Sequence, residues 1–173
     1  MRGAGRVGLL AGALVCLALA SARADDGDLT LGVAGGYDYA ALGQGAAALG
    51  MHGGGGGIAL RYGVGEALSL QAQGFAAGAA GPRALGGATL GVAYSLDLLR
   101  VVPTFEAGLG VLGVTAEPGP KVALGLALGL SVDYVLTRRV ALGAAVRTRL
   151  ALSDPGGLPL WLWVGPQVSV LLR

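Results

Sequence analysis

The sequence predicts an all-β protein, an eight-stranded antiparallel up-and-down transmembrane β-barrel. The main observation is an alternation that runs from residue 29 to residue 172 and is clearest in 122–134, VALGLALGLSVDY. There Val, Leu and Tyr occupy every second position, and Gly, Ala, Ser and Asp fill the positions between. A period of two residues indicates a β-strand, because successive side chains point to opposite faces. A large aliphatic face opposite a small or polar one fits a barrel with lipid outside and a narrow interior.

Composition and the lack of a helical pattern support this fold class. The chain is 54% hydrophobic and 13% charged, with a mean hydropathy of +0.68, which is typical of a membrane protein. The long uncharged stretches 39–60 and 155–172 are poor helices, because one contains Gly53–Gly57 and the other contains three prolines. A soluble barrel of the lipocalin type would place its aliphatic residues inside and its charges outside.

The N-terminus predicts a secretory signal peptide over residues 1–24, followed by a barrel domain over 25–173. Two arginines precede the uncharged run 7–22, and an Ala-x-Ala cleavage site follows at 22–24. The alternative is a membrane-anchoring helix, for which the run is somewhat short. Cleavage removes three arginines and leaves nine basic against ten acidic residues, a net charge of −1. The composition therefore gives no argument for nucleic-acid binding, and the mature chain loses its single cysteine.

The alternation divides the chain into eight expected strands, at 28–39, 56–64, 66–77, 84–96, 99–111, 121–135, 139–151 and 159–172. The second, fourth and sixth strands end in the tight links Gly63–Glu66, Ser95–Asp97 and Leu136–Arg138. The first, third, fifth and seventh end in longer links rich in Gly, Ala and Pro, at 40–55, 78–83, 112–120 and 152–158. Short periplasmic turns opposite longer external loops are typical of outer-membrane barrels. An even number of strands also lets the last pair with the first, which leaves no open edge in lipid.

Tyrosine placement predicts aromatic girdles at both rims. Tyr62, Tyr94 and Tyr134 end the second, fourth and sixth strands on the aliphatic face, so they are expected at one height in contact with lipid. Tyr37 and Tyr39 end the first strand and are expected at the opposite rim. The sequence leaves the orientation of Trp161 and Trp163 undecided. Their parity points them inward, whereas a bulge at Pro166 would turn them to lipid.

The inward face carries the charges, which are expected to form a network in the lumen from Arg61, Glu106, Asp133, Arg147 and Arg149. Arg147 is the preferred partner of Glu106, with Arg61 and Arg149 as alternatives. The same parity places these further polar and basic residues inside: Ser69, Gln71, Gln73, Arg100, Thr104, Lys121, Ser131 and Arg139. The remaining inward positions are mostly Gly and Ala, which leave space. The lumen is therefore either closed by paired charges or a narrow passage for small, partly apolar molecules.

Catalytic, cofactor and metal sites are not expected. His52 is the only histidine, and it falls in the expected loop 40–55 with no serine nearby in sequence. One histidine and no mature cysteine make a zinc site improbable. Gly53–Gly57 lacks the Lys-Ser/Thr of a phosphate loop and precedes a strand instead of a helix.

Two segments, VVPTFEAGLGV (101–111) and GLSVDYVLTRRVALG (129–143), resemble the fifth strand and the following hairpin of small outer-membrane barrels of the OmpA-, OmpX- or OmpW-like families. The resemblance covers about 25–173. It implies the outer membrane of a Gram-negative-type bacterium, contact with outer-membrane lipid, insertion by the barrel-assembly machinery, and a monomer. The function expected is structural, with a plugged lumen. A narrow passive pore or carrier is the alternative, and a lipid-modifying enzyme is a weaker one.

Overall fold

The computed structural model describes residues 27–42, 49–79, 84–97, 100–115, 119–153 and 160–172. The expected signal peptide and the single cysteine lie outside these ranges. The described chain forms eight strands: β1 (Leu29–Leu42), β2 (Leu49–Gly63), β3 (Leu68–Ala79), β4 (Ala84–Ser95), β5 (Val101–Val114), β6 (Lys121–Val135), β7 (Val140–Ala151) and β8 (Leu160–Leu171).

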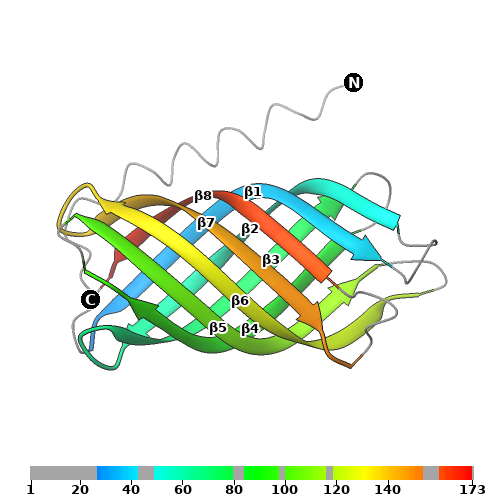
Figure 1. Cartoon of the computed structure of the whole chain (residues 1–173), viewed down its shortest axis with the longest axis horizontal. Helices are drawn as coiled ribbons and strands as arrows, with labels where there is room; N and C mark the ends of the chain where they lie inside the picture. The colour runs from blue at the N-terminus through cyan, green and yellow to red at the C-terminus, as the bar shows by residue number, and fades with distance from the viewer. Residues whose placement is uncertain are drawn as a thin grey trace, which may run out of the picture.

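The strands close into one barrel in sequence order, as Figure 1 shows. Every strand pairs antiparallel with its neighbours, and β8 returns to pair with β1, for example at Val33 and Val168. The predicted fold class is confirmed. One end of the barrel carries the links after β2, β4 and β6 together with the start of β1 and the end of β8; we name it the turn end. The opposite end is named the loop end.

Three predicted strand boundaries are wrong, and all three strands reach further toward the loop end. The β1 strand ends at Leu42 instead of residue 39, because its last residues still pair with β2. The β2 strand begins at Leu49 instead of residue 56, so Gly53–Gly57 belong to it and pair with both β1 and β3. Glycine does not end this strand because its backbone groups still join both ladders of a closed sheet. The β5 strand continues past residue 111 to Val114, because Leu112 and Val114 face inward into an apolar layer.

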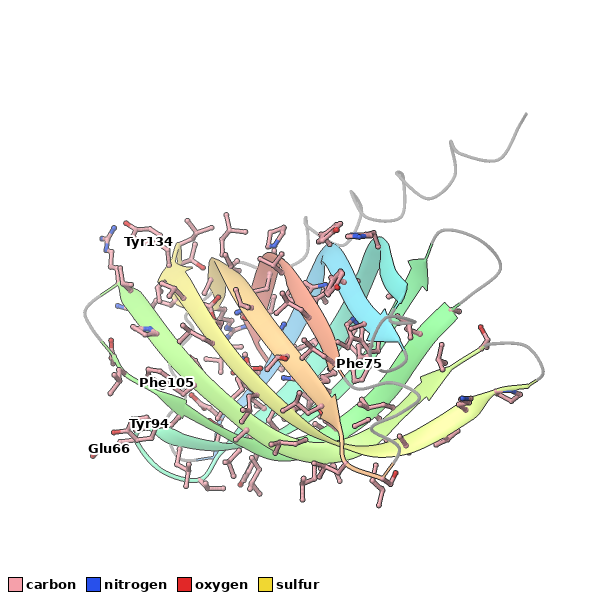
Figure 2. The ribbon with its side chains drawn as sticks, turned by 45° about the vertical axis from the view of Figure 1, so that its right-hand side comes forward. Glu66, Phe75, Tyr94, Phe105 and Tyr134 are labelled. Atoms are coloured by element: carbon pink, nitrogen blue, oxygen red, sulfur yellow. The ribbon has the colours of Figure 1, made fainter. Side chains whose placement is uncertain are left out.

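The outer surface carries the aliphatic side chains, which are exposed, as expected of a face that meets lipid. Tyr62, Tyr94 and Tyr134 are each nearly half exposed at the turn end, where Phe105 pairs beside Tyr94 (Figure 2). Tyr37 is equally exposed near the loop end. Among the residues that the structure describes, no helix is long and apolar enough to cross a membrane.

The lumen is layered along the barrel. Near the turn end its wall carries small hydroxyl-bearing residues such as Ser69, Thr104 and Ser131, all buried. Buried charges and amides occupy the middle. Toward the loop end the wall becomes apolar, with this packed cluster: Ala40, Ala77, Leu85, Leu112, Val114, Ala123, Ala151 and Trp161.

Candidate functional site

The centre of the lumen is organised around Glu106 of β5, whose carboxylate accepts hydrogen bonds from side chains of three other strands. Arg147 of β7 binds it with both ends of the guanidinium fork, at 2.8 Å from Nε to Oε2 and 3.0 Å from Nη2 to Oε1. Arg61 of β2 forms a second ion pair with Oε1 through Nη2. Gln73 of β3 donates to Oε2 at 2.7 Å. Charge-assisted bonds of this kind are among the stronger ones in proteins.

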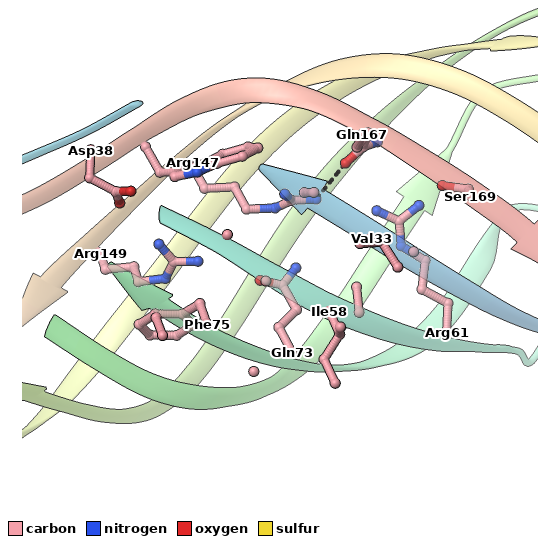
Figure 3. Close-up of a pocket in the computed structure, with 18 of the residues that line it drawn as sticks. Val33, Asp38, Ile58, Arg61, Gln73, Phe75, Arg147, Arg149, Gln167 and Ser169 are labelled. Atoms are coloured by element: carbon pink, nitrogen blue, oxygen red, sulfur yellow. Dashed lines mark hydrogen bonds between the residues drawn. The ribbon is translucent and has the colours of Figure 1, made fainter. Parts of the chain in front are cut away.

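Amide side chains extend this centre in both directions. Gln71 accepts from Arg61 Nε at 2.7 Å and so holds that guanidinium against the wall. On the other side, Arg147 Nη2 donates to Gln167 Oε1 at 2.8 Å, shown as the dashed line in Figure 3. Gln167 in turn donates to Asp133 Oδ1 at 2.8 Å. A connected chain of polar side chains therefore joins β2, β3, β5, β6, β7 and β8 across the lumen.

The structure divides the predicted lumen network into two groups of side chains. Arg61, Glu106 and Arg147 meet directly, and Asp133 is joined to them through Gln167. Arg149, weighed as another partner of Glu106, lies one inward position further along β7 and contacts aromatic rings instead. We name the set Arg61, Gln73, Glu106 and Arg147 the central network.

Arg149 belongs to a second cluster near the apolar layer. Its guanidinium carbon lies 3.6 Å from the centre of the Phe75 ring and 5.1 Å from that of Trp161. The two rings meet edge to face, with centroids 4.8 Å apart and planes at 77°. Trp161 Nε1 donates to Asp38 Oδ1. Figure 3 shows the Arg149 side chain between Asp38 and Phe75.

The orientation of the tryptophans, which parity alone left open, is inward. Trp161 is 1% exposed and Trp163 4% exposed. The β7–β8 register runs unbroken through Pro166, which pairs opposite Ala144, so no bulge reverses the faces. Trp163 lies beside Arg147, whose guanidinium carbon is 5.3 Å from the centre of its ring.

Several predictions about polar residues need correction. Lys121 and Arg139 share the inward parity but are exposed, because they lie at strand ends where long side chains reach water. Arg100 is exposed as well, but it lines the turn-end opening of the lumen, in keeping with its parity. His52 is not a loop residue: it lies in β2, faces outward, and contacts Tyr37 and Tyr39 at the loop-end rim.

In the described ranges, no group of three His, Cys, Asp or Glu side chains is arranged to hold a metal.

Asp38 is the site residue that sequence reasoning missed. It stands on the inward parity of β1 between two outward tyrosines, so its direction was readable from the alternation. Its role was not, because its partner Trp161 comes from β8 and meets it only when the barrel closes.

The free space of the lumen is unevenly distributed. A vestibule of about 990 Å³ opens at the turn end, lined by hydroxyl groups such as Thr30, Ser95 and Ser169 and by the charged residues Glu66, Asp97, Arg100 and Arg138. Beside the central network lie two small cavities, of about 30 and 10 Å³. The larger of these shares Thr30, Arg61 and Ser169 with the vestibule. The central network therefore separates a wide polar chamber from spaces that hold a water molecule or two.

Comparison with known proteins identifies the fold. No protein-family model matches the sequence, and no curated protein matches it. Solved structures do match. Neisserial surface protein A superposes with a TM-score of 0.70 at 15% identity, over 82% of this chain and 96% of that one. The N-terminal β-barrel domain of OprF from Pseudomonas aeruginosa gives 0.62 at 16% identity, over 86% and 98%.

Ail, the attachment invasion locus protein of Yersinia pestis, gives a TM-score of 0.53 at 9% identity, over 84% of this chain and 98% of that one. At such identities the likeness concerns the fold alone. The chain has the fold of the small eight-stranded outer-membrane barrels, and its lumen side chains have to be interpreted from their own geometry.

Proposed function

We propose that the protein is a structural barrel of the outer membrane, without catalytic activity, whose lumen is closed by the central network. The observation that carries this proposal is the joining of Glu106 to arginines from strands on both sides of β5. The interior of an eight-stranded barrel is just wide enough for side chains to fill it. A carboxylate bound by two arginines and a glutamine at that level leaves little room for a solute.

The proposed location rests on the outer surface and the fold. Exposed aliphatic residues between two sets of aromatic side chains fit a hydrocarbon layer bounded by two interfaces. The expected signal peptide would deliver the chain to the periplasm, where the barrel-assembly machinery would insert it with its turn end on the periplasmic side. The closed ladder leaves no strand edge to pair with a second copy, which favours a monomer.

A narrow passage for small, partly apolar molecules is the second candidate function. It is supported by the vestibule and by the small cavity that shares Thr30, Arg61 and Ser169 with it. A lipid-modifying enzyme has less support, because the described contacts of His52 are with two tyrosines rather than a serine.

Conductance across a planar bilayer distinguishes the two candidates. We expect refolded wild-type protein to show little or no steady conductance, and Glu106→Ala to raise it by loosening the central network. Glu66→Ala, which removes an exposed carboxylate at the turn end, is the matched control. A steady wild-type conductance that Glu106→Ala leaves unchanged would contradict the plugged barrel and favour the passage.

A further inference from the structure

We propose that the corner formed by Phe75, Trp161 and Asp38 is a binding site for an organic cation, and that the Arg149 guanidinium occupies it in the closed barrel. The site lies between the central network and the apolar layer. It does not depend on whether the lumen conducts, because it concerns what the corner can bind.

The chemistry of the corner matches a cation. Two aromatic rings at 4.8 Å and 77° present faces with negative potential, and the guanidinium carbon of Arg149 lies 3.6 Å from one ring centre and 5.1 Å from the other. Trp161 fixes the Asp38 carboxylate through Oδ1, while Oδ2 is buried and has no hydrogen-bond partner among the described residues. Aromatic faces beside a carboxylate oxygen that can accept hydrogen bonds provide both kinds of contact that a guanidinium or ammonium group uses.

Arg149 is held much less firmly than Arg147. Arg147 is bound by Glu106 through both ends of its fork and by Gln167. The buried Arg149 Nε, in contrast, has no hydrogen-bond partner within the described chain. Since an unpaired buried donor costs free energy, exchanging this side chain for a free cation of better fit carries a smaller penalty than displacing Arg147 would.

A small cavity adjoins the corner on the side of the vestibule. The cavity of about 30 Å³ is lined by Asp38, Phe75, Arg149 and Trp161 and by the backbone of Gly56 and Gly57, which present no side chain to it (Figure 3). The cavity shares Thr30, Arg61 and Ser169 with the vestibule, so the corner lies nearer to the turn-end solvent than its burial alone suggests. Removal of the Arg149 side chain would enlarge this space by the volume of the guanidinium that now fills the corner.

The test removes the internal occupant and supplies a free one. Arg149→Ala should bind ethylguanidinium, with a saturable change in the fluorescence of Trp161 and Trp163, the only tryptophans of the chain. Wild-type protein should need at least about tenfold more ligand, because Arg149 competes for the corner. Arg149→Ala combined with Asp38→Asn should lose most of the response. Arg139→Ala, an equal charge change at an exposed residue that does not line the vestibule, and sodium chloride at matched ionic strength are the controls.

Two results obtained with refolded protein would overturn the proposal. One is a refolded Arg149→Ala protein without a saturable response. The other is an equal response after Asp38→Asn is added, which would place the ligand elsewhere. Should Arg149→Ala refold poorly, ethylguanidinium in the refolding buffer should restore its yield, because a ligand that binds only the folded state stabilises it. A yield that ethylguanidinium fails to raise more than sodium chloride does also counts against the site. Bilayer conductance is not needed for any of these outcomes, so failure here is distinct from failure of the plugged-lumen proposal.

Discussion

Replacing Glu106 by alanine is the most direct perturbation of the lumen. The carboxylate accepts bonds from Arg147 at 2.8 and 3.0 Å, from Gln73 at 2.7 Å, and from Arg61. Its removal leaves two guanidinium groups facing each other without the negative charge between them. Both repulsion between the arginines and loss of their hydrogen bonds then oppose the folded state.

The expected cost follows from the burial of these groups. Breaking a buried ion pair by deleting one partner typically costs about 3–5 kcal/mol, because the remaining charge stays desolvated. Both arginine side chains are largely buried, at 9% exposed for Arg147 and 13% for Arg61. Of the two, Arg61 borders the vestibule, so water compensates part of its loss. We therefore expect Glu106→Ala to lower the free energy of unfolding by about 3 kcal/mol, at the low end of that range. Glu66→Ala should stay within about 0.5 kcal/mol.

The assay is urea unfolding in lipid vesicles, followed by tryptophan fluorescence and combined with double-mutant cycles. Glu106→Ala with Arg147→Met, and Glu106→Ala with Arg61→Met, should each be less destabilised than the sum of their single variants. Coupling no larger than about 0.3–0.5 kcal/mol in both cycles, the level of independent sites, would refute the reasoning. The lumen would then be hydrated enough to screen its charges, and the passage would become the better function.

Three further predictions concern the outer face, the packing of the lumen and the N-terminus. Leu109 is 61% exposed on the outer face, and Leu109→Arg should destabilise the barrel by about 2–4 kcal/mol if this position lies near the membrane midplane. Val64→Arg, at the turn end, should cost about 1 kcal/mol or less. Equal costs for the two variants in vesicle refolding would show that the cost does not depend on depth in the membrane. At Gly143 an added Cβ would lie 2.0 Å from a carboxylate oxygen and 2.3 Å from a carbonyl oxygen of β6, so Gly143→Ala should cost about 1–3 kcal/mol. Gly113→Ala, with contacts of 3.7 Å or more, should be close to neutral in the same titration, and a reversed order would contradict the packing. Amino-terminal sequencing of protein from fractionated outer membranes should begin at Asp25, and an intact Met1 would disprove cleavage.

The alternation of the sequence was sufficient to predict the strands and their faces wherever large residues carry it. In β6 it assigns Leu124 and Leu128 to the outside and Ser131 and Asp133 to the inside, as the structure has them. It failed at the start of β2, because consecutive glycines have no large side chain to mark either face. The length of β2 is set there by its pairing with β1 and β3, and the local sequence does not encode this pairing.

Partners across the lumen follow less directly from the alternation, although Arg147, the preferred partner of Glu106, does bind it. Arg147 and Arg149 have the same parity on β7, and their spacing along the strand does not show which one meets Glu106. That choice depends on the shear of the closed barrel, which sets the relative height of strands that are not neighbours. Asp38 and Trp161 likewise meet only through the closure of β8 onto β1.

The arrangement of the lumen gives a structural reason for some of the glycines in the chain. Each of the three buried carboxylates lies against a glycine of the neighbouring strand: Asp38 Oδ2 against Gly55, Glu106 Oε2 against Gly129, and Asp133 Oδ1 against Gly143, where an added Cβ would come within 2.2, 2.8 and 2.0 Å. A short acidic side chain can therefore lie flat on the wall. The remaining width is left for the longer arginines that reach it from other strands. A bias toward glycine-rich coding would explain how many glycines the chain has, but it would not place one opposite every lumen carboxylate. These positions connect the composition of the chain to the closed lumen, because a larger residue at any of them would push the carboxylate away from its partners.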